Sequence, residues 1–139
     1  MLLLTKAKFE IYLPKKCDIL CYDQGKKFNT NVRKIFKSLK FDILYVRLEK
    51  VNLLVAIKSA ISKILNFKLS LKDHYIRNYC YYSDPKIILS TSHLDKSFLY
   101  LKKNTYNNYK TVLVQRCPYK NSDFNIKRKK PEIDQTYLF

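Results

Sequence analysis

The sequence contains very little glycine: Gly25 is the only one among 139 residues. Phosphate-binding loops of the GxGxxG and P-loop types need several glycines, because their backbone approaches the phosphates closely and adopts positive φ angles. Both kinds of site are therefore excluded. The HExxH, GxSxG and DxD motifs are absent as well, which removes the best-known sequence signatures of hydrolytic and metal-dependent chemistry.

Histidine and paired cysteine are also scarce. The chain has 2 His and 4 Cys, and no two cysteines stand in a CxxC spacing. Zinc sites usually draw on such pairs, so we expect no metal site and no cofactor. The apolar start, residues 1–4, is too short for a signal peptide or a membrane span. We therefore expect reduced, buried thiols in a cytoplasmic protein, with at most peripheral contact at the inner face of the membrane.

Acidic residues are few, with 11 Asp+Glu against 28 Lys+Arg and a net charge of +17. This balance favours phosphate-bearing partners: nucleic acid, anionic lipid or nucleotide sugars. However, 23 of the basic residues are Lys and 5 are Arg, and the enriched residue types share AT-rich codons. Genome composition is therefore an alternative source of the charge. With 47% hydrophobic residues, residues 1–139 are expected to form a single domain with its own core.

Short apolar runs alternate with segments of helical periodicity. Runs rich in β-branched and aromatic residues predict buried strands at residues 18–22, 41–46, 86–91 and 111–115. Helical spacing of apolar residues predicts helices at 29–39, 52–65, 69–83 and 97–103. The alternation predicts a Rossmann-like α/β domain with a mainly parallel sheet and helices on both faces. Further strands are expected at 8–13 and 135–139, and a mobile basic loop at 119–134.

Two of the predicted helices carry distinctive faces. The helix at 52–65 should pack an apolar face on the sheet, and replacing a buried Ile there by Ala should cost about 2–5 kcal/mol. That face consists of Leu54, Ile57, Ile61 and Ile64. The helix at 69–83 has tyrosines at helical spacing, which are interpreted as a half-buried packing face rather than a platform for stacking bases. These are Tyr75, Tyr79 and Tyr82.

Polar residues gather where the predicted strands end. In an open α/β sheet, ligands bind outside the carboxyl ends of the strands. The candidate substrate-binding residues at this edge are Asp23, Arg47, Asn52, Asp95, Gln115 and Arg116. Glu49 and His93 are the candidate catalytic bases. The alternative is that these side chains only cap or pair: Asp23 in a turn, Arg47 and Glu49 with neighbours, His93 with solvent or a helix end.

Several short blocks of sequence follow one another in an order that resembles a known family. The blocks are Asp18-Ile19-Leu20-x-Tyr22-Asp23-x-Gly25, Ile43-Leu44-Tyr45-Val46-Arg47-x-Glu49-x-Val51-Asn52, Pro85-Lys86-Ile87-Ile88-Leu89 leading to Asp95, Phe98-x-x-Leu101-Lys102, and Val112-x-Val114-Gln115. In order and spacing they resemble the N-terminal half of bacterial surface-carbohydrate biosynthesis transferases. Those proteins are related to GT-B glycosyltransferases and polyglycerol-phosphate-type transferases. The resemblance covers residues 15–139, and its most specific block is R-x-E-x-x-N at 47–52.

The resemblance implies an acceptor-side N-terminal domain that takes a sugar or sugar-phosphate acceptor and works with a second transferase domain or subunit. Two departures fall on the predicted site: Gln115-Arg116-Cys117 replaces Gln-Asn-Gly, and His93-Leu94 replaces Asp-Asn. We therefore expect a truncated or split transferase that is inactive alone. The alternative function is a small basic protein that binds nucleic acid or an anionic membrane surface through Lys-rich segments. A nonfunctional remnant of a transferase is the third interpretation.

Overall fold

The chain folds around a five-stranded parallel sheet. The computed structural model describes residues 7–22, 26–47, 49–91, 95–99, 101, 109–115 and 135–138. The strand order is β3-β2-β5-β6-β7, and each neighbouring pair is parallel. The strands are β2 (Ile19–Tyr22), β3 (Phe41–Leu44), β5 (Ile87–Ser90), β6 (Lys110–Gln115) and β7 (Gln135–Leu138). The Rossmann-like α/β fold predicted from the sequence is thus confirmed.

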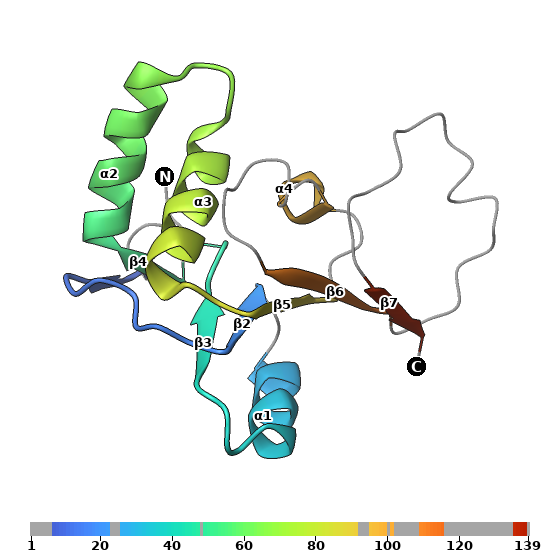
Figure 1. Ribbon diagram of the computed structural model, residues 1–139. Helices are drawn as coiled ribbons and strands as arrows, with labels where there is room; N and C mark the ends of the chain where they lie inside the picture. The colour runs from blue at the N-terminus through green and yellow to red at the C-terminus, as the bar shows by residue number, and fades with distance from the viewer. Residues whose placement is uncertain are drawn as a thin grey trace, which may run out of the picture.

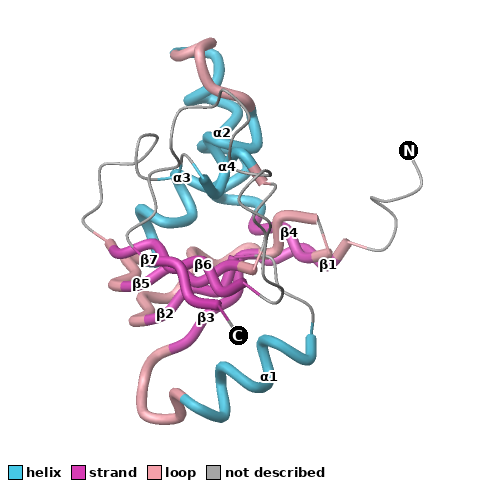
Figure 2. The backbone as a smooth tube through the Cα atoms, turned by 90° about the vertical axis from the view of Figure 1, so that its right-hand side faces the viewer, coloured by secondary structure: helices cyan, strands magenta, loops and turns pink. Residues whose placement is uncertain are grey.

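Helices cover both faces of this sheet. Helix α1 (Lys26–Ile35) lies on one face. On the other face lie α2 (Leu53–Leu65), α3 (Leu71–Ser83) and the short α4 (Lys96–Leu99), as Figures 1 and 2 show. Among the described residues, no helix has both the length and the apolar character needed to cross a bilayer.

Strands β2, β3, β5 and β6 each contribute to two hydrophobic clusters because successive side chains point to opposite faces. In β2, Leu20 and Tyr22 belong to the larger cluster, which includes residues of α2, α3 and α4. Ile19 and Cys21 point the other way and pack in the smaller cluster with Val32 of α1. Burial on both faces explains why the strands appear in the sequence as continuous apolar runs rather than as polar–apolar alternation.

The order of the strands creates a topological switch point. From β2 the chain passes through α1 to β3 on one side of β2, and from β3 it returns through α2 and α3 to β5 on the other side of β2. The two connections lie on opposite faces of the sheet (Figure 2). In a sheet of this order the chain leaves two neighbouring strands in opposite directions, here β2 and β5, and ligands of such folds bind outside the carboxyl ends of these strands.

A second, two-stranded parallel sheet was not predicted as such. It pairs β1 (Lys8–Glu10) with β4 (Lys50–Asn52), so that Glu10 stands opposite Asn52. The sequence suggested a strand over 8–13, but it placed residues 47–52 in the junction between a strand and a helix. In the structure this junction contains a turn, then β4, and only then α2.

The predicted orientation of α2 was wrong. The face expected to pack on the sheet is turned outward, with exposed fractions of 40–67% for its four apolar residues. Helix α2 instead buries Val55 and Ser59. It packs against α3, and Asn78 of α3 donates a hydrogen bond to Ser59 Oγ at 3.0 Å. The spacing of the apolar residues correctly indicated a helix, but the face with Val55 and Ser59 packs against α3 instead.

Helix α3 begins with a capping box and ends in a left-handed residue. The Ser70 hydroxyl accepts from the Asp73 backbone N–H, and the Asp73 carboxylate accepts from the Ser70 backbone N–H. These bonds satisfy N–H groups that the first helical turn leaves unpaired. Asp84 closes the helix with φ 43°. The tyrosine row of α3 packs against the larger hydrophobic cluster, so its interpretation as a packing face is confirmed.

Candidate functional site

Three of the eight predicted site residues cannot be placed. Asp23, His93 and Arg116 lie outside the residues that the structure describes, as does the basic segment 119–134. Gln115 is the last residue of β6, at the predicted carboxyl edge of the sheet. The remaining four candidates are Arg47, Glu49, Asn52 and Asp95, and they do not form one cluster.

Arg47 and Glu49 lie in the turn between β3 and β4, and both are exposed. The backbone of Glu49 has a structural role, since its carbonyl accepts a hydrogen bond from the Lys8 N–H at 3.0 Å. This bond extends the β1–β4 pairing by one residue. Arg47 therefore follows the carboxyl end of β3 as predicted, whereas Glu49 belongs to the edge of the small sheet.

Asp95 immediately precedes α4, on the carboxyl side of β5. Its carboxylate accepts from the Ser97 N–H and pairs with Lys72 Nζ, both at 2.9 Å. Burial raises the pKa of Asp95, but Lys72, the Ser97 N–H and the Tyr22 hydroxyl outweigh this effect, so the pKa lies below its usual value. The carboxylate is therefore ionised, and its contacts with Ser97 and Lys72 connect α4 to α3.

Asn52 is buried and acts as the N-cap of α2. Its side-chain oxygen accepts from the Val55 N–H at 3.1 Å, and its amide nitrogen donates to the Tyr12 carbonyl. Its backbone N–H donates to the Tyr75 hydroxyl at 3.0 Å. Asn52 therefore joins four segments: β4, α2, α3 and the loop that follows β1. It is also the predicted site residue that lines a pocket.

The pocket lies at the opposite edge of the main sheet from the one predicted. It has a volume of about 830 Å³, within the range of small-molecule sites. Its wall includes the segment between β1 and β2, the beginning of β3, the end of β4, and α3. The lining residues are Glu10, Tyr12, Leu13, Pro14, Lys15, Lys16, Cys17, Lys40, Phe41, Asp42, Lys50, Asn52 and Tyr79.

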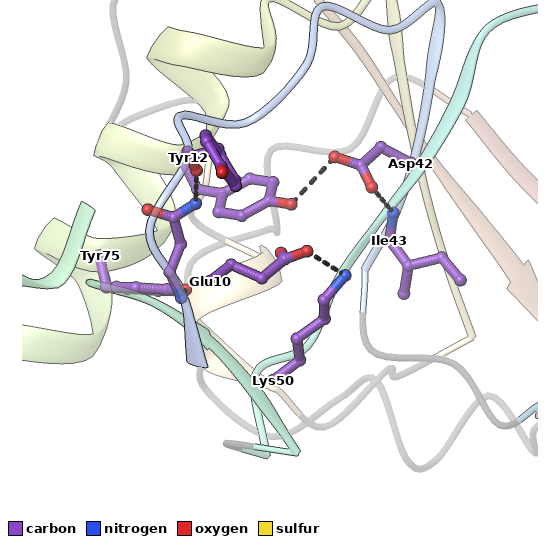
Figure 3. Close-up of polar contacts among 8 residues, drawn as sticks. Glu10, Tyr12, Asp42, Ile43, Lys50 and Tyr75 are labelled. Atoms are coloured by element: carbon purple, nitrogen blue, oxygen red, sulfur yellow. Dashed lines mark hydrogen bonds and ion pairs between the residues drawn. The ribbon is translucent and has the colours of Figure 1, made fainter. Parts of the chain in front are cut away.

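Asp42 is the most perturbed carboxyl group of this pocket. It accepts a hydrogen bond from the Tyr79 hydroxyl at 2.9 Å. It also accepts one from the Ile43 N–H at 2.8 Å (Figure 3). Burial raises its pKa, and these two donors only partly offset the effect. A partly buried carboxyl group with a raised pKa in a pocket is a candidate for exchanging a proton with a bound ligand.

An ion pair and several lysines surround Asp42. Lys50 of β4 pairs with Glu10 of β1, with 2.6 Å between Nζ and Oε1 (Figure 3). Three further lysines of the lining, Lys15, Lys16 and Lys40, are exposed. Cations around a pocket attract phosphate, while carboxyl, amide and phenol groups bind hydroxyls. The arrangement can therefore bind a small polyhydroxylated anion.

The thiol in this pocket is not a nucleophile. Burial, together with the nearby carboxylates Asp42 and Asp18, raises the pKa of Cys17 to about 12. The thiolate, which is the reactive form, is therefore scarce at neutral pH. Across the described ranges no three His, Cys, Asp or Glu side chains are grouped so that they could hold a metal ion.

Sequence reasoning missed Asp42, Tyr79, Glu10 and Lys50. Asp42 lies inside a predicted buried strand, and a single polar residue within such an apolar run does not indicate a binding site. The contact with Tyr79 joins residues 37 positions apart in the chain. Comparison of the chain with family models, with curated proteins and with solved structures finds no match.

Proposed function

We propose that this chain is the acceptor-side domain of a GT-B-like transferase in cell-surface carbohydrate biosynthesis, and that its pocket holds a sugar-phosphate acceptor. The observation that carries the proposal is the Asp42 carboxyl group, held by Tyr79 inside a pocket lined by lysines. The all-parallel sheet and the order of the blocks at 18–25, 43–52 and 85–89 support the same function.

The chemistry of the pocket suits such an acceptor. Lys15, Lys16 and Lys40 supply positive charge for the phosphate, and lysine binds phosphate as a point charge. Asp42 can accept the proton of a sugar hydroxyl, and a raised pKa brings a carboxylate closer to the basicity that this task requires. Glu10 offers a further group for sugar hydroxyls.

Transfer also needs a donor site. A transferase must bring donor and acceptor together and stabilise the leaving phosphate, and positioning supplies several kcal/mol of the reduction in the barrier. We place the donor contacts on a partner domain or subunit. The purified chain should therefore bind an acceptor but show no sugar transfer from nucleotide sugars. Turnover by the chain alone, abolished by Asp42→Asn or Glu49→Gln, would contradict this part of the proposal.

Isothermal titration tests the acceptor site directly. Glucose 6-phosphate should bind more tightly than glucose or inorganic phosphate, because it engages both the lysines and the hydroxyl-binding groups. The double variant Lys15→Gln/Lys16→Gln should lower the affinity for glucose 6-phosphate by about tenfold, and the affinity for glucose much less. Lys37→Gln, in an exposed residue that does not line the pocket, is the matched control. Equal affinities for wild type and the double variant would overturn the assignment of the site.

The alternative function is a small basic protein that binds nucleic acid or an anionic membrane surface. Binding to duplex DNA should be weak, without sequence preference, and should fall steeply with salt if the charge reflects composition. Peripheral contact with the inner face of the membrane is compatible with either function. The exposed apolar face of α2 favours that contact specifically.

A further inference from the structure

One helix of the protein leaves a continuous apolar stripe uncovered. On α2 the exposed residues are Leu54, Ile57, Ile61, Ile64 and Leu65, with exposed fractions of 40–82%. The stripe continues past the helix into Phe67 (75%) and Leu71 (53%). We call these seven residues the α2 stripe. Isolated exposed apolar residues are ordinary, but a contiguous patch of them marks a surface that another body covers.

Helical geometry places the stripe on the outside of the molecule. At 3.6 residues per turn, its five helical members fall within a sector of roughly 100°. Val55 and Ser59 face the opposite way and are buried beside α3. In Figure 1, α2 stands at the margin of the fold with α3 between it and β5. The stripe therefore lies on the side of α2 that faces away from α3.

The charge around the stripe has a single sign. No Asp or Glu occurs between Glu49 and Asp73, whereas the same interval contains five lysines. Lys50 and Lys72 pair with carboxylates. The other three, Lys58, Lys63 and Lys68, pair with no carboxylate of a described residue. Lys58 donates to the Tyr82 hydroxyl, and Lys63 donates to the Phe67 and Leu69 carbonyls at the end of α2.

We propose that the α2 stripe inserts into the surface of an anionic phospholipid bilayer, with Lys58 and Lys68 beside the lipid phosphates. A helix with one apolar face and cationic flanks lies in the plane of the interface, and lysines near an anionic leaflet strengthen the attachment. With 13 residues, α2 is too short to cross the bilayer. Phe67 and Leu65, at the corner between α2 and α3, enter the lipid with the helix.

The chemistry of the stripe distinguishes lipid from a protein partner. None of its side chains can donate or accept a hydrogen bond, and its flanks carry cations alone. A surface that is apolar beneath and anionic above matches both features, and a bilayer is such a surface. No residue of the stripe lines the pocket. The inference therefore stands independently of the transferase function.

Vesicle sedimentation tests the proposal. The full chain should sediment with vesicles of phosphatidylcholine mixed with an equal amount of phosphatidylglycerol, and at least about tenfold less with vesicles of phosphatidylcholine alone. Ile61→Ser should lower partition into the anionic vesicles several-fold, since it removes an inserted apolar side chain. Ile35→Ser is the matched control: Ile35 is 73% exposed at the end of α1, on the opposite face of the sheet (Figure 2). It should leave partition unchanged.

A fluorescent reporter checks the orientation, because the chain contains no tryptophan. In Phe67→Trp the single tryptophan should shift its emission to the blue on addition of the anionic vesicles. In Phe36→Trp, just after α1, the emission should not shift. Equal shifts at both positions would overturn the orientation.

Two other results would overturn the proposal itself. The first is equal sedimentation of the wild type and Ile61→Ser with anionic vesicles, which would indicate that charge alone attaches the protein. The second is an absence of vesicle binding together with a dimer, seen by analytical ultracentrifugation, that Ile61→Ser dissociates. The stripe would then be an interface between two copies of this chain.

Discussion

The hydroxyl group of Tyr79 donates a hydrogen bond of 2.9 Å to the carboxylate of Asp42, and this bond connects α3 to β3. It has two physical effects. It satisfies a carboxylate that is partly withdrawn from water, and it fixes the side chain that we assign to the pocket. Tyr79 itself is buried, and burial raises the pKa of its phenol. The phenol is therefore a hydrogen-bond donor throughout the ordinary pH range.

Tyr79→Phe should lower the free energy of unfolding by about 1–3 kcal/mol, because it leaves a partly buried carboxylate with one donor fewer. Urea denaturation followed by circular dichroism measures the change. Tyr81→Phe is the matched control, since Tyr81 lies on the same helix and is exposed. An equal, small effect of both substitutions would show that the bond contributes nothing to stability.

Because the pKa of Asp42 is raised, its contribution to the free energy of unfolding changes with pH in the opposite direction from that of a carboxylate whose pKa is lowered. Burial raises the pKa above 3.8, the value for the unfolded chain. Between these two pKa values the folded protein binds more protons than the unfolded chain, so the free energy of unfolding falls as pH rises. The wild type should therefore lose stability relative to Asp42→Asn as pH rises from 3.8 through the raised pKa of the folded protein.

Asp18 provides the opposite control. A hydrogen bond from Lys86 and another from the Lys40 N–H lower its pKa. Its contribution is therefore present above the unfolded pKa and is lost as pH falls, so the wild type should gain stability relative to Asp18→Asn as pH rises. Urea denaturation at several pH values measures both differences. Parallel trends for the two variants would contradict the environment described for Asp42.

The main sheet could be predicted from the sequence because its strands are buried on both faces. The run Ile19–Tyr22 has no polar position, and such a run has few other stable arrangements in a chain of this size. Strand β4 was missed because it has three residues, two of them polar, and it is held by pairing with β1. A strand that depends on a partner about forty positions away leaves no local signal.

The outward face of α2 shows a second limit of prediction from the sequence. The spacing of Leu54, Ile57 and Ile61 indicates a helix with one apolar face, but a period cannot specify what covers that face. Val55 and Ser59 meet α3 because Ser59 pairs with Asn78 of that helix. Asn52 shows a related limit. Asn52 was a sound candidate as a polar residue after a strand, but its side chain is used to cap α2.

The exposure of the α2 stripe reverses the expected effect of truncation. Val55→Ala should cost about 2 kcal/mol, because Val55 is fully buried and loses two packed methyl groups. Ile57→Ala, in a residue that is exposed in the monomer, should change stability by less than about 0.5 kcal/mol. Thermal or urea unfolding of the two variants measures the contrast. A loss of about 2–5 kcal/mol for Ile57→Ala would restore the original prediction that this face packs on the sheet.

Asn52 offers the sharpest separation of a structural role from a binding role. Asn52→Ala removes the acceptor that caps α2 and the donor to the Tyr12 carbonyl. It should lower the free energy of unfolding by about 2 kcal/mol. Asn52→Ser keeps an N-cap oxygen but is too short to reach Tyr12, so it should recover about half of the loss.

Affinity for glucose 6-phosphate completes this test. If Asn52 is mainly a cap, Asn52→Ser keeps most of the affinity, because the lysines and Asp42 remain in place. If Asn52 mainly binds ligand, both variants keep their stability and lose affinity together. Urea denaturation and titration of the same two proteins measure these outcomes. The three hydrogen bonds of Asn52, to Val55, Tyr12 and Tyr75, favour the first outcome, since an amide engaged on both its atoms has little capacity left for a ligand.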